Sequence, residues 1–247
     1  GRGGKPRPTP IVHVTHQAIN PALKAALSTD LAGLEKAIDQ DLKPRSAVLK
    51  GWRAELTTSI TTVRTEVKNV VGVLEGKGRR ANETIVIGAH YDHVGRGGPG
   101  SLAGGSTEVH NGADDNASGT VCLIELARRF AARDKPLPRR LVFIAFTAEE
   151  RGLIGSARYV NNPVFPLEDT VAMFNMDMVG RLREAKLTVF GTGTAKRFKS
   201  QVTKLGKKHQ FHLSMKPSGF GPSDHSSFYG KGIPVLHFFT GTHKDYH

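Results

Sequence analysis

The sequence has 247 residues, enough for one substantial hydrophobic core and at most part of a second. Its 38% hydrophobic and 23% charged residues are typical of a globular protein, and no apolar run reaches the roughly 20 residues of a membrane-spanning helix. Lysine and arginine number 35 against 22 acidic residues, a net charge of +13. Because the basic residues are dispersed and lack interleaved aromatic residues, we expect solvated surface charge and no nucleic-acid partner.

The first 50 residues predict an arm followed by short elements. Residues 1–10 are mostly glycine, proline and basic residues, which predicts a disordered basic arm without the pattern of a signal peptide. The run "PIVHVT", residues 10–15, predicts a short strand. Leucine and alanine at helical spacing in residues 20–40 predict two short helices, with Ser28, Thr29 or Asp30 as a cap between them.

The rest of the chain predicts a layered α/β domain. Residues 53–75 alternate β-branched and polar positions, which predicts strands of an antiparallel pair or a sheet edge. Further strands are expected at 84–89, 140–147, 170–177, 186–191 and 233–239, and helices at 119–133, 152–161 and 194–208. This alternation favours three α/β/α layers around a central mixed, mainly parallel sheet.

Acidic and imidazole side chains follow the apolar strands. They are His90, Asp92, Glu149, Glu150, Asp177, His243 and His247. The carboxyl ends of parallel strands meet at one edge of a sheet, and carboxylates gathered there repel one another unless a cation is present. Imidazoles and carboxylates without a thiolate favour zinc, with manganese or cobalt as substitutes. Two metal ions would need a shared carboxylate, which the loop "HNGADDNASGT" is able to supply.

Six motifs carry a family resemblance. In chain order they are "HYDH", "NGADDNASG", "TAEERGLIGS", "NMDMVG", "SDHSSF" and "HKDYH". Together they resemble the di-zinc aminopeptidases grouped as family twenty-eight of the metallopeptidases, over residues 70–247. The resemblance implies the zinc exopeptidase fold, a secreted or periplasmic location, and zinc-dependent hydrolysis of N-terminal bonds in peptides or proteins with a free N-terminus. It leaves the oligomeric state open.

The resemblance also implies the ligands of two zinc ions. His90, Asp115 and Asp177 would hold one ion, and Asp115, Glu150 and His247 the other, with Asp115 bridging both. Asp115 is chosen over its neighbour because the family's bridging acid directly precedes the position held here by an asparagine. The family pattern further implies a cis peptide bond after the bridge.

Three residues are expected to take part in catalysis. By the resemblance, Glu149 is the general base for a water between the metal ions, and Tyr246 donates a hydrogen bond to the developing oxyanion. Asp92, two residues after a ligand histidine, is expected to accept the free imidazole N–H of His90 and so to orient that ring. His93 is expected to be an ordinary loop or packing residue.

The motif "SDHSSF" and its surroundings give the substrate-side candidates. Asp224 and His225 are expected to support that side of the site, with a purely structural role equally open. Phe220, in the glycine-flanked loop "SGFGPSDH", is a candidate for an apolar substrate pocket, whereas the other phenylalanines nearby are expected in the core.

The sequence also bears on the domains at the two ends of the chain and on alternative activities. Residues 11–50 resemble the tail of a protease-associated insert domain, and residues 51–247 a catalytic domain truncated at its C-terminus. The alternatives to an aminopeptidase are a one-zinc glutaminyl cyclase, a carboxypeptidase and a non-catalytic interaction module. The intact pair His90 and Asp177 favours two metal ions and hydrolysis, and the complete ligand set disfavours the module.

Overall fold

The computed structural model describes residues 13–55, 63–97 and 100–247, and the predicted arm at residues 1–10 lies outside them. The described residues separate into two compact units, and the boundary falls between Arg64 and Thr65. None of the described helices is both long and apolar enough to cross a membrane.

The N-terminal unit contains the two predicted helices, α1 (His16–Leu27) and α2 (Leu31–Asp41). Asp30 caps α2 by accepting the N–H of Gly33 at 3.0 Å. The predicted strand at 10–15 is wrong in its described part, because residues 13–15 are irregular. The Thr15 hydroxyl there accepts the N–H of Ala18, so this polar residue begins a helix instead.

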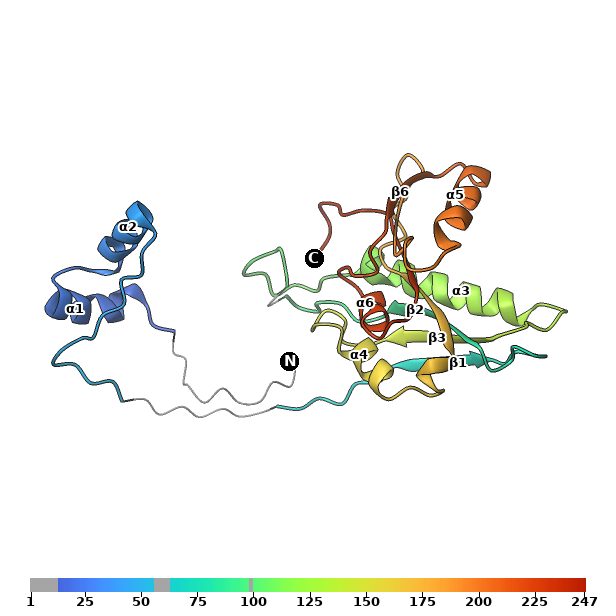
Figure 1. Ribbon diagram of the computed structural model, residues 1–247, viewed down its shortest axis with the longest axis horizontal. Helices are drawn as coiled ribbons and strands as arrows, with labels where there is room; N and C mark the ends of the chain where they lie inside the picture. Colours follow the sequence, from blue (N-terminus) through green and yellow to red (C-terminus); the bar gives the residue numbers. More distant parts are fainter. Residues whose placement is uncertain (1–12, 56–62, 98–99) are drawn as a thin grey trace. The chain divides into compact units, whose positions relative to one another are not determined.

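The larger unit is built on one seven-stranded sheet (Figure 1). Its strands are β1 (Val70–Leu74), β2 (Thr84–His90), β3 (Arg140–Phe146), β4 (Thr170–Met176), β5 (Lys186–Phe190), β6 (His212–Lys216) and β7 (Val235–Phe239). Their order is β1-β3-β2-β4-β7-β5-β6. Four neighbouring pairs are parallel, and only β1 with β3 and β5 with β7 are antiparallel. The predicted mixed, mainly parallel sheet is therefore confirmed.

Helices pack on both faces of this sheet. They are α3 (Gly119–Ala131), α4 (Ile154–Asn161), α5 (Phe198–Lys208) and α6 (His225–Tyr229), with short helical turns η1 (Ala113–Ser118) and η2 (Leu167–Asp169). Alternate residues of β2 explain the two cores: Val86 packs with α4 and α6, and Ile87 packs with α3. The three-layer prediction is confirmed.

Three further features differ from the expectations. Residues 53–55 and 63–69 form no strand, so the segment predicted at 53–75 contributes only β1, while residues 56–62 lie outside the described part. The strand β6 and the helix α6 were not predicted. The sequence of β6 is polar and exposed on alternate residues, and α6 has only five residues, so neither gives a strong periodic signal.

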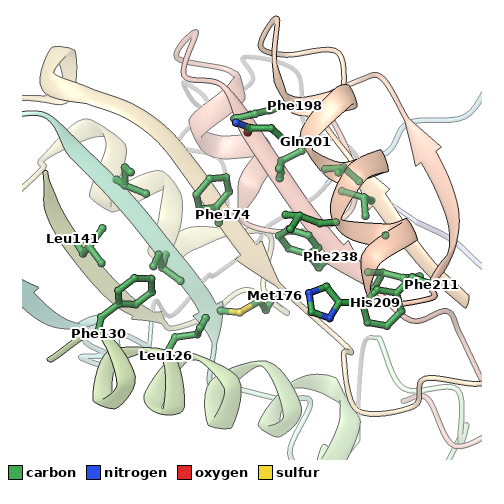
Figure 2. A pocket seen from close by; sticks show the side chains of 18 of the residues that line it. Leu126, Phe130, Leu141, Phe174, Met176, Phe198, Gln201, His209, Phe211 and Phe238 are labelled. Carbon is green, nitrogen blue, oxygen red and sulfur yellow. The ribbon is translucent and has the colours of Figure 1, made fainter. Parts of the chain in front are cut away.

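An apolar groove of about 520 Å³ separates α3 from α5 over the sheet. Figure 2 shows Leu126 and Phe130 from α3 on one side, Phe198 and Gln201 from α5 on the other, and side chains of the sheet between them, Phe174 among them. The groove lies on the face of the sheet that carries the core around Leu123 of α3.

Candidate metal centre

The carboxyl ends of the central strands bring the predicted residues together. β2 ends at His90, Asp177 follows β4 directly, and Glu149 follows β3 after a turn. β3, β2 and β4 are consecutive neighbours in the sheet, and they run parallel, so these three ends meet at one edge. Asp115 arrives from η1, ahead of α3, and His247 from the segment after β7.

The carboxylate of Asp115 lies between two imidazoles. Its Oδ1 is 3.2 Å from His90 Nε2, and its Oδ2 is 2.9 Å from His247 Nε2. The predicted cis peptide bond joins Asp115 to Asn116. The side chain of Asn116 accepts the backbone N–H of Met178 at 3.2 Å. The carboxylate of Asp115 thus faces His90 with one oxygen and His247 with the other.

The first group of donor atoms consists of His90, Glu149 and Asp177, whose donor atoms lie within 4.8 Å of one another. His90 Nε2 is 3.4 Å from Asp177 Oδ1. Burial disfavours the charged imidazole, but the carboxylates of Asp115 and Asp177 outweigh this effect and raise the pKa of His90 to about 12. This cluster of negative charge therefore favours a cation.

The second group consists of His93, Asp115, Glu150 and His247, again with donor atoms within 4.8 Å of one another. Glu150 Oε1 is 3.1 Å from His247 Nε2 and 2.9 Å from His93 Nδ1. Burial, followed by the charge of Asp115, raises the pKa of the Glu150 carboxyl. Each ligand set expected from the resemblance is thus brought together around Asp115.

Glu149, a member of the first group, is partly buried. Burial raises the pKa of its carboxyl to about 9, although the neighbouring His90 opposes the shift. The backbone N–H groups of Glu149 and Glu150 donate to the carboxylate of Asp92, at 3.0 and 3.3 Å. Asp92 therefore holds the turn from which both glutamates project.

This use of the Asp92 carboxylate corrects the expected contact with His90. The Nδ1 atom of His90 lies 3.1 Å from the backbone carbonyl oxygen of Asp92, while the nearer carboxylate oxygen is 3.8 Å away. The carbonyl accepts the imidazole N–H, because the carboxylate is engaged with the following turn. His247 is oriented similarly, with Nδ1 at 2.9 Å from the carbonyl oxygen of Gly100. In both rings Nε2 faces Asp115.

The two aromatic candidates, Tyr246 and Phe220, lie in different settings. Tyr246 stacks on the ring of His247, with centroids 3.9 Å apart. Burial, followed by the nearby carboxylates, raises the pKa of Tyr246 to about 12 and keeps its hydroxyl protonated. Phe220 is 61% exposed and packs edge-on against Tyr229, with centroids 4.7 Å apart.

Asp224 and His225 are fully buried, and their expected support of the substrate side stays a prediction. The ring of His225 stacks on His237 at a centroid distance of 4.2 Å, and neither of its nitrogens has a hydrogen-bond partner among the described residues. Burial raises the pKa of the Asp224 carboxyl to about 7. These residues lie in the packed layer between α6 and the sheet.

Sequence reasoning missed His93, which belongs to the second group. Its ring packs edge-on against His247, with centroids 5.3 Å apart. Gly112, at φ +63°, leaves room for this ring, because a Cβ atom there would lie 2.8 Å from His93 Cγ. The spacing of His93 three residues after His90 was the available signal, but a loop histidine is a common packing residue.

The donor set fits divalent zinc. Imidazole nitrogens and carboxylate oxygens are ordinary zinc ligands, and both groups lie at the same edge of the sheet without a thiolate in either group. The carboxylates of Asp115 and Asp177, which raise the pKa of His90, concentrate negative charge where a cation would bind.

Known proteins match the larger unit. The model of peptidase family M28 matches residues 69–247. Aminopeptidase YwaD of Bacillus subtilis is 29% identical over 177 residues, which is 70% of this chain and 36% of that protein. The solved structure of the zinc aminopeptidase BSAP of Bacillus subtilis has a TM-score of 0.58 at 31% identity, and the match covers 72% of this chain and 42% of that protein. An aminopeptidase of Aneurinibacillus sp. strain AM-1 has a TM-score of 0.58 at 29% identity, and the match covers 72% of this chain and 40% of that protein. The chain thus spans about two fifths of the length of these relatives.

Proposed function

This chain belongs to peptidase family M28, and on that premise we propose that it is a zinc-dependent aminopeptidase that hydrolyses the N-terminal bond of peptides. The observation that carries the proposal is the position of Asp115 between His90 and His247, with one carboxylate oxygen toward each. The names of the similar aminopeptidases support the same activity.

We propose that two zinc ions bind at this edge of the sheet. His90, Asp115 and Asp177 would hold one ion, and Asp115, Glu150 and His247 the other. His93 lies close enough to the second set to add a ligand or to orient Glu150. Bound zinc supplies Lewis acidity, which polarises a peptide carbonyl and lowers the pKa of water toward neutrality.

Glu149 then acts as the general base and general acid. Its carboxylate takes a proton from the attacking water and returns it to the nitrogen of the leaving amine, while the C–N bond breaks. Burial supports this role because it raises the pKa of Glu149, which makes the carboxylate a stronger base. The positive charge of a loaded site opposes this shift and keeps the group ionised before it accepts the proton.

Other residues position these groups or the substrate. Asp92 holds the backbone of Glu149 and Glu150 and, through its carbonyl, the ring of His90. The protonated hydroxyl of Tyr246 is suited to donate a hydrogen bond to the oxyanion. Phe220, exposed on its loop, is a candidate contact for an apolar substrate side chain.

Activity toward amino-acid 4-nitroanilides, compared with N-blocked versions, tests this proposal. We expect hydrolysis of the free-amine substrates only, its loss with a chelator and its recovery with zinc. Cleavage of blocked peptides from the carboxyl end would establish a carboxypeptidase instead. Cyclisation of an N-terminal glutamine without hydrolysis would establish the cyclase alternative.

A further inference from the structure

We propose that Asp114 and His243 form a buried pair that positions the segments carrying the zinc ligands, and thereby sets the affinity of the site for zinc. The inference rests on the proposed zinc centre. Neither residue belongs to the two groups of candidate donor atoms, so both are positioning residues.

Asp114 joins three segments through one side chain. Its Oδ2 lies 2.9 Å from His243 Nε2, on the segment that continues to His247. Its Oδ1 accepts the backbone N–H of Gly180 at 2.7 Å, on the loop that follows Asp177. Its own backbone continues directly into Asp115. A ligand of the proposed centre lies within four residues of each point of attachment.

Neighbouring hydrogen bonds tie the same segments together. The Ser118 hydroxyl donates to the carbonyl of Asp114 at 2.7 Å and accepts the N–H of Val179 at 3.0 Å. The Thr240 hydroxyl donates to the carbonyl of Met178 at 2.6 Å. These three hydrogen bonds join a side chain to the backbone, whereas Asp114 and His243 join two ionisable side chains.

Burial makes this pair more consequential than an ion pair on the surface. The two side chains are only 6% and 3% exposed, respectively. Loss of either partner leaves the other buried without its hydrogen bond, which costs more than a surface ion pair contributes. The Nδ1 atom of His243 has no partner among the described residues, so Asp114 supplies the contact that orients the ring.

The position of His247 depends on this orientation. His243 is one point at which the last segment is anchored beside η1, and the backbone N–H of Tyr246 donates to its carbonyl at 3.2 Å. A segment released from Asp114 would hold His247 less firmly against Asp115. Groups that orient metal ligands typically change metal affinity 10- to 100-fold when they are removed.

The test compares His243→Leu, His243→Gln, Asp114→Asn and the double variant of His243→Leu with Asp114→Asn. Zinc affinity is measured by competition with a chelator, and the Tm of each metal-free protein is measured separately. We expect His243→Leu and Asp114→Asn each to weaken zinc binding by about 10- to 100-fold. The double variant should lose no more than the larger single loss. The side-chain amide of His243→Gln is able to reach Asp114 and should restore most of the affinity.

His212→Leu is the matched control, because His212 is exposed on the edge strand β6 and away from these segments. It should leave zinc affinity unchanged. Zinc binding by His243→Leu as tight as that of the unaltered chain would overturn the positioning role and leave the proposed function standing. The role would equally be overturned by additive losses in the double variant, or by a lower metal-free Tm with unchanged zinc affinity. An unaltered chain that binds no zinc would overturn the proposed function itself and, with it, this inference.

Discussion

Glu149 and Glu150 are consecutive in the sequence, yet their carboxylates lie in different groups of donor atoms. Glu149 joins His90 and Asp177, whereas Glu150 joins the group around Asp115. The turn that carries both glutamates begins after Ala148. Ala148 adopts φ +52°, which is uncommon for a residue with a side chain. This division agrees with the proposed roles, in which Glu149 transfers the proton and Glu150 binds a metal ion.

The first prediction separates these two roles. Glu149→Gln keeps the size of the side chain but removes the basic carboxylate, so kcat should fall by about 10²- to 10⁴-fold. Because the proposed zinc ligands remain, the zinc content after dialysis should match that of the unaltered chain. Zinc analysis beside steady-state kinetics checks both points. Loss of zinc from Glu149→Gln, with zinc retained in Glu150→Gln, would reverse the assignment of the two glutamates.

The second prediction concerns the turn that Asp92 holds. Asp92→Ala removes the acceptor of the Glu149 and Glu150 N–H groups. We expect zinc affinity to weaken by about 10- to 100-fold, because Glu150 then loses its fixed position. Asp92→Asn retains one carbonyl acceptor and should show a smaller effect. Equal zinc affinity in the unaltered chain, Asp92→Ala and Asp92→Asn would argue against a role of Asp92 in positioning Glu150.

The third prediction concerns Gly112, which lies beside Asp115. A Cβ atom at Gly112 would be 2.7 Å from the carbonyl oxygen of Asp115, and the backbone there has φ +63°. Gly112→Ala should therefore lower the free energy of unfolding by about 1–3 kcal/mol and weaken zinc binding. Denaturant unfolding and chelator competition measure the two effects. Gly72→Ala is the control, because a Cβ atom at Gly72 would meet no atom within 4 Å.

The fourth prediction follows from the stacked pair of His225 and His237. Burial lowers the pKa of His225 to about 4, and burial followed by the charge of His225 lowers that of His237 to about 3. In the unfolded chain both imidazoles titrate near pH 6.5. As the pH falls below 6.5, the unfolded state therefore binds protons that the folded state does not accept, and stability is lost progressively toward pH 4.

Replacement of one ring isolates this contribution. His225→Phe removes one titrating group. The unfolding free energy of this variant should therefore fall less steeply as the pH is lowered, and between pH 6 and pH 4.5 its slope should be smaller by about 1.4 kcal/mol per pH unit. The comparison uses metal-free proteins, in which all other titrating groups are shared. Because the slope is compared, a change in packing that shifts stability equally at every pH does not affect the result. Identical slopes would contradict the lowered pKa of His225.

The fold was predictable where the sequence has strong periodicity. The apolar runs of β2, β3 and β4 identify buried central strands, and their carboxyl ends locate the site, because neighbouring parallel strands end together. The strand β6 was missed because it lies at the sheet edge and alternates exposed polar residues with partly buried ones. A five-residue strand of this kind gives little signal against a loop.

The site was predictable in its residue types but not in every contact. The spacing of His90 and Asp92 suggested a contact between them, yet the backbone carbonyl of Asp92 makes it, and a sequence pattern does not distinguish a carbonyl from a carboxylate. The motif "SDHSSF" identified Asp224 and His225 but not their full burial, since burial depends on how α6 packs on the sheet.

The central claim is that Asp115 joins two zinc sites, one on each side of its carboxylate. Anomalous diffraction from crystals of the zinc-loaded protein, collected on both sides of the zinc absorption edge, tests it most directly. The account predicts two zinc peaks roughly 3.5–4 Å apart, one beside each carboxylate oxygen of Asp115. A single peak at Asp115, or zinc bound only elsewhere, would contradict it.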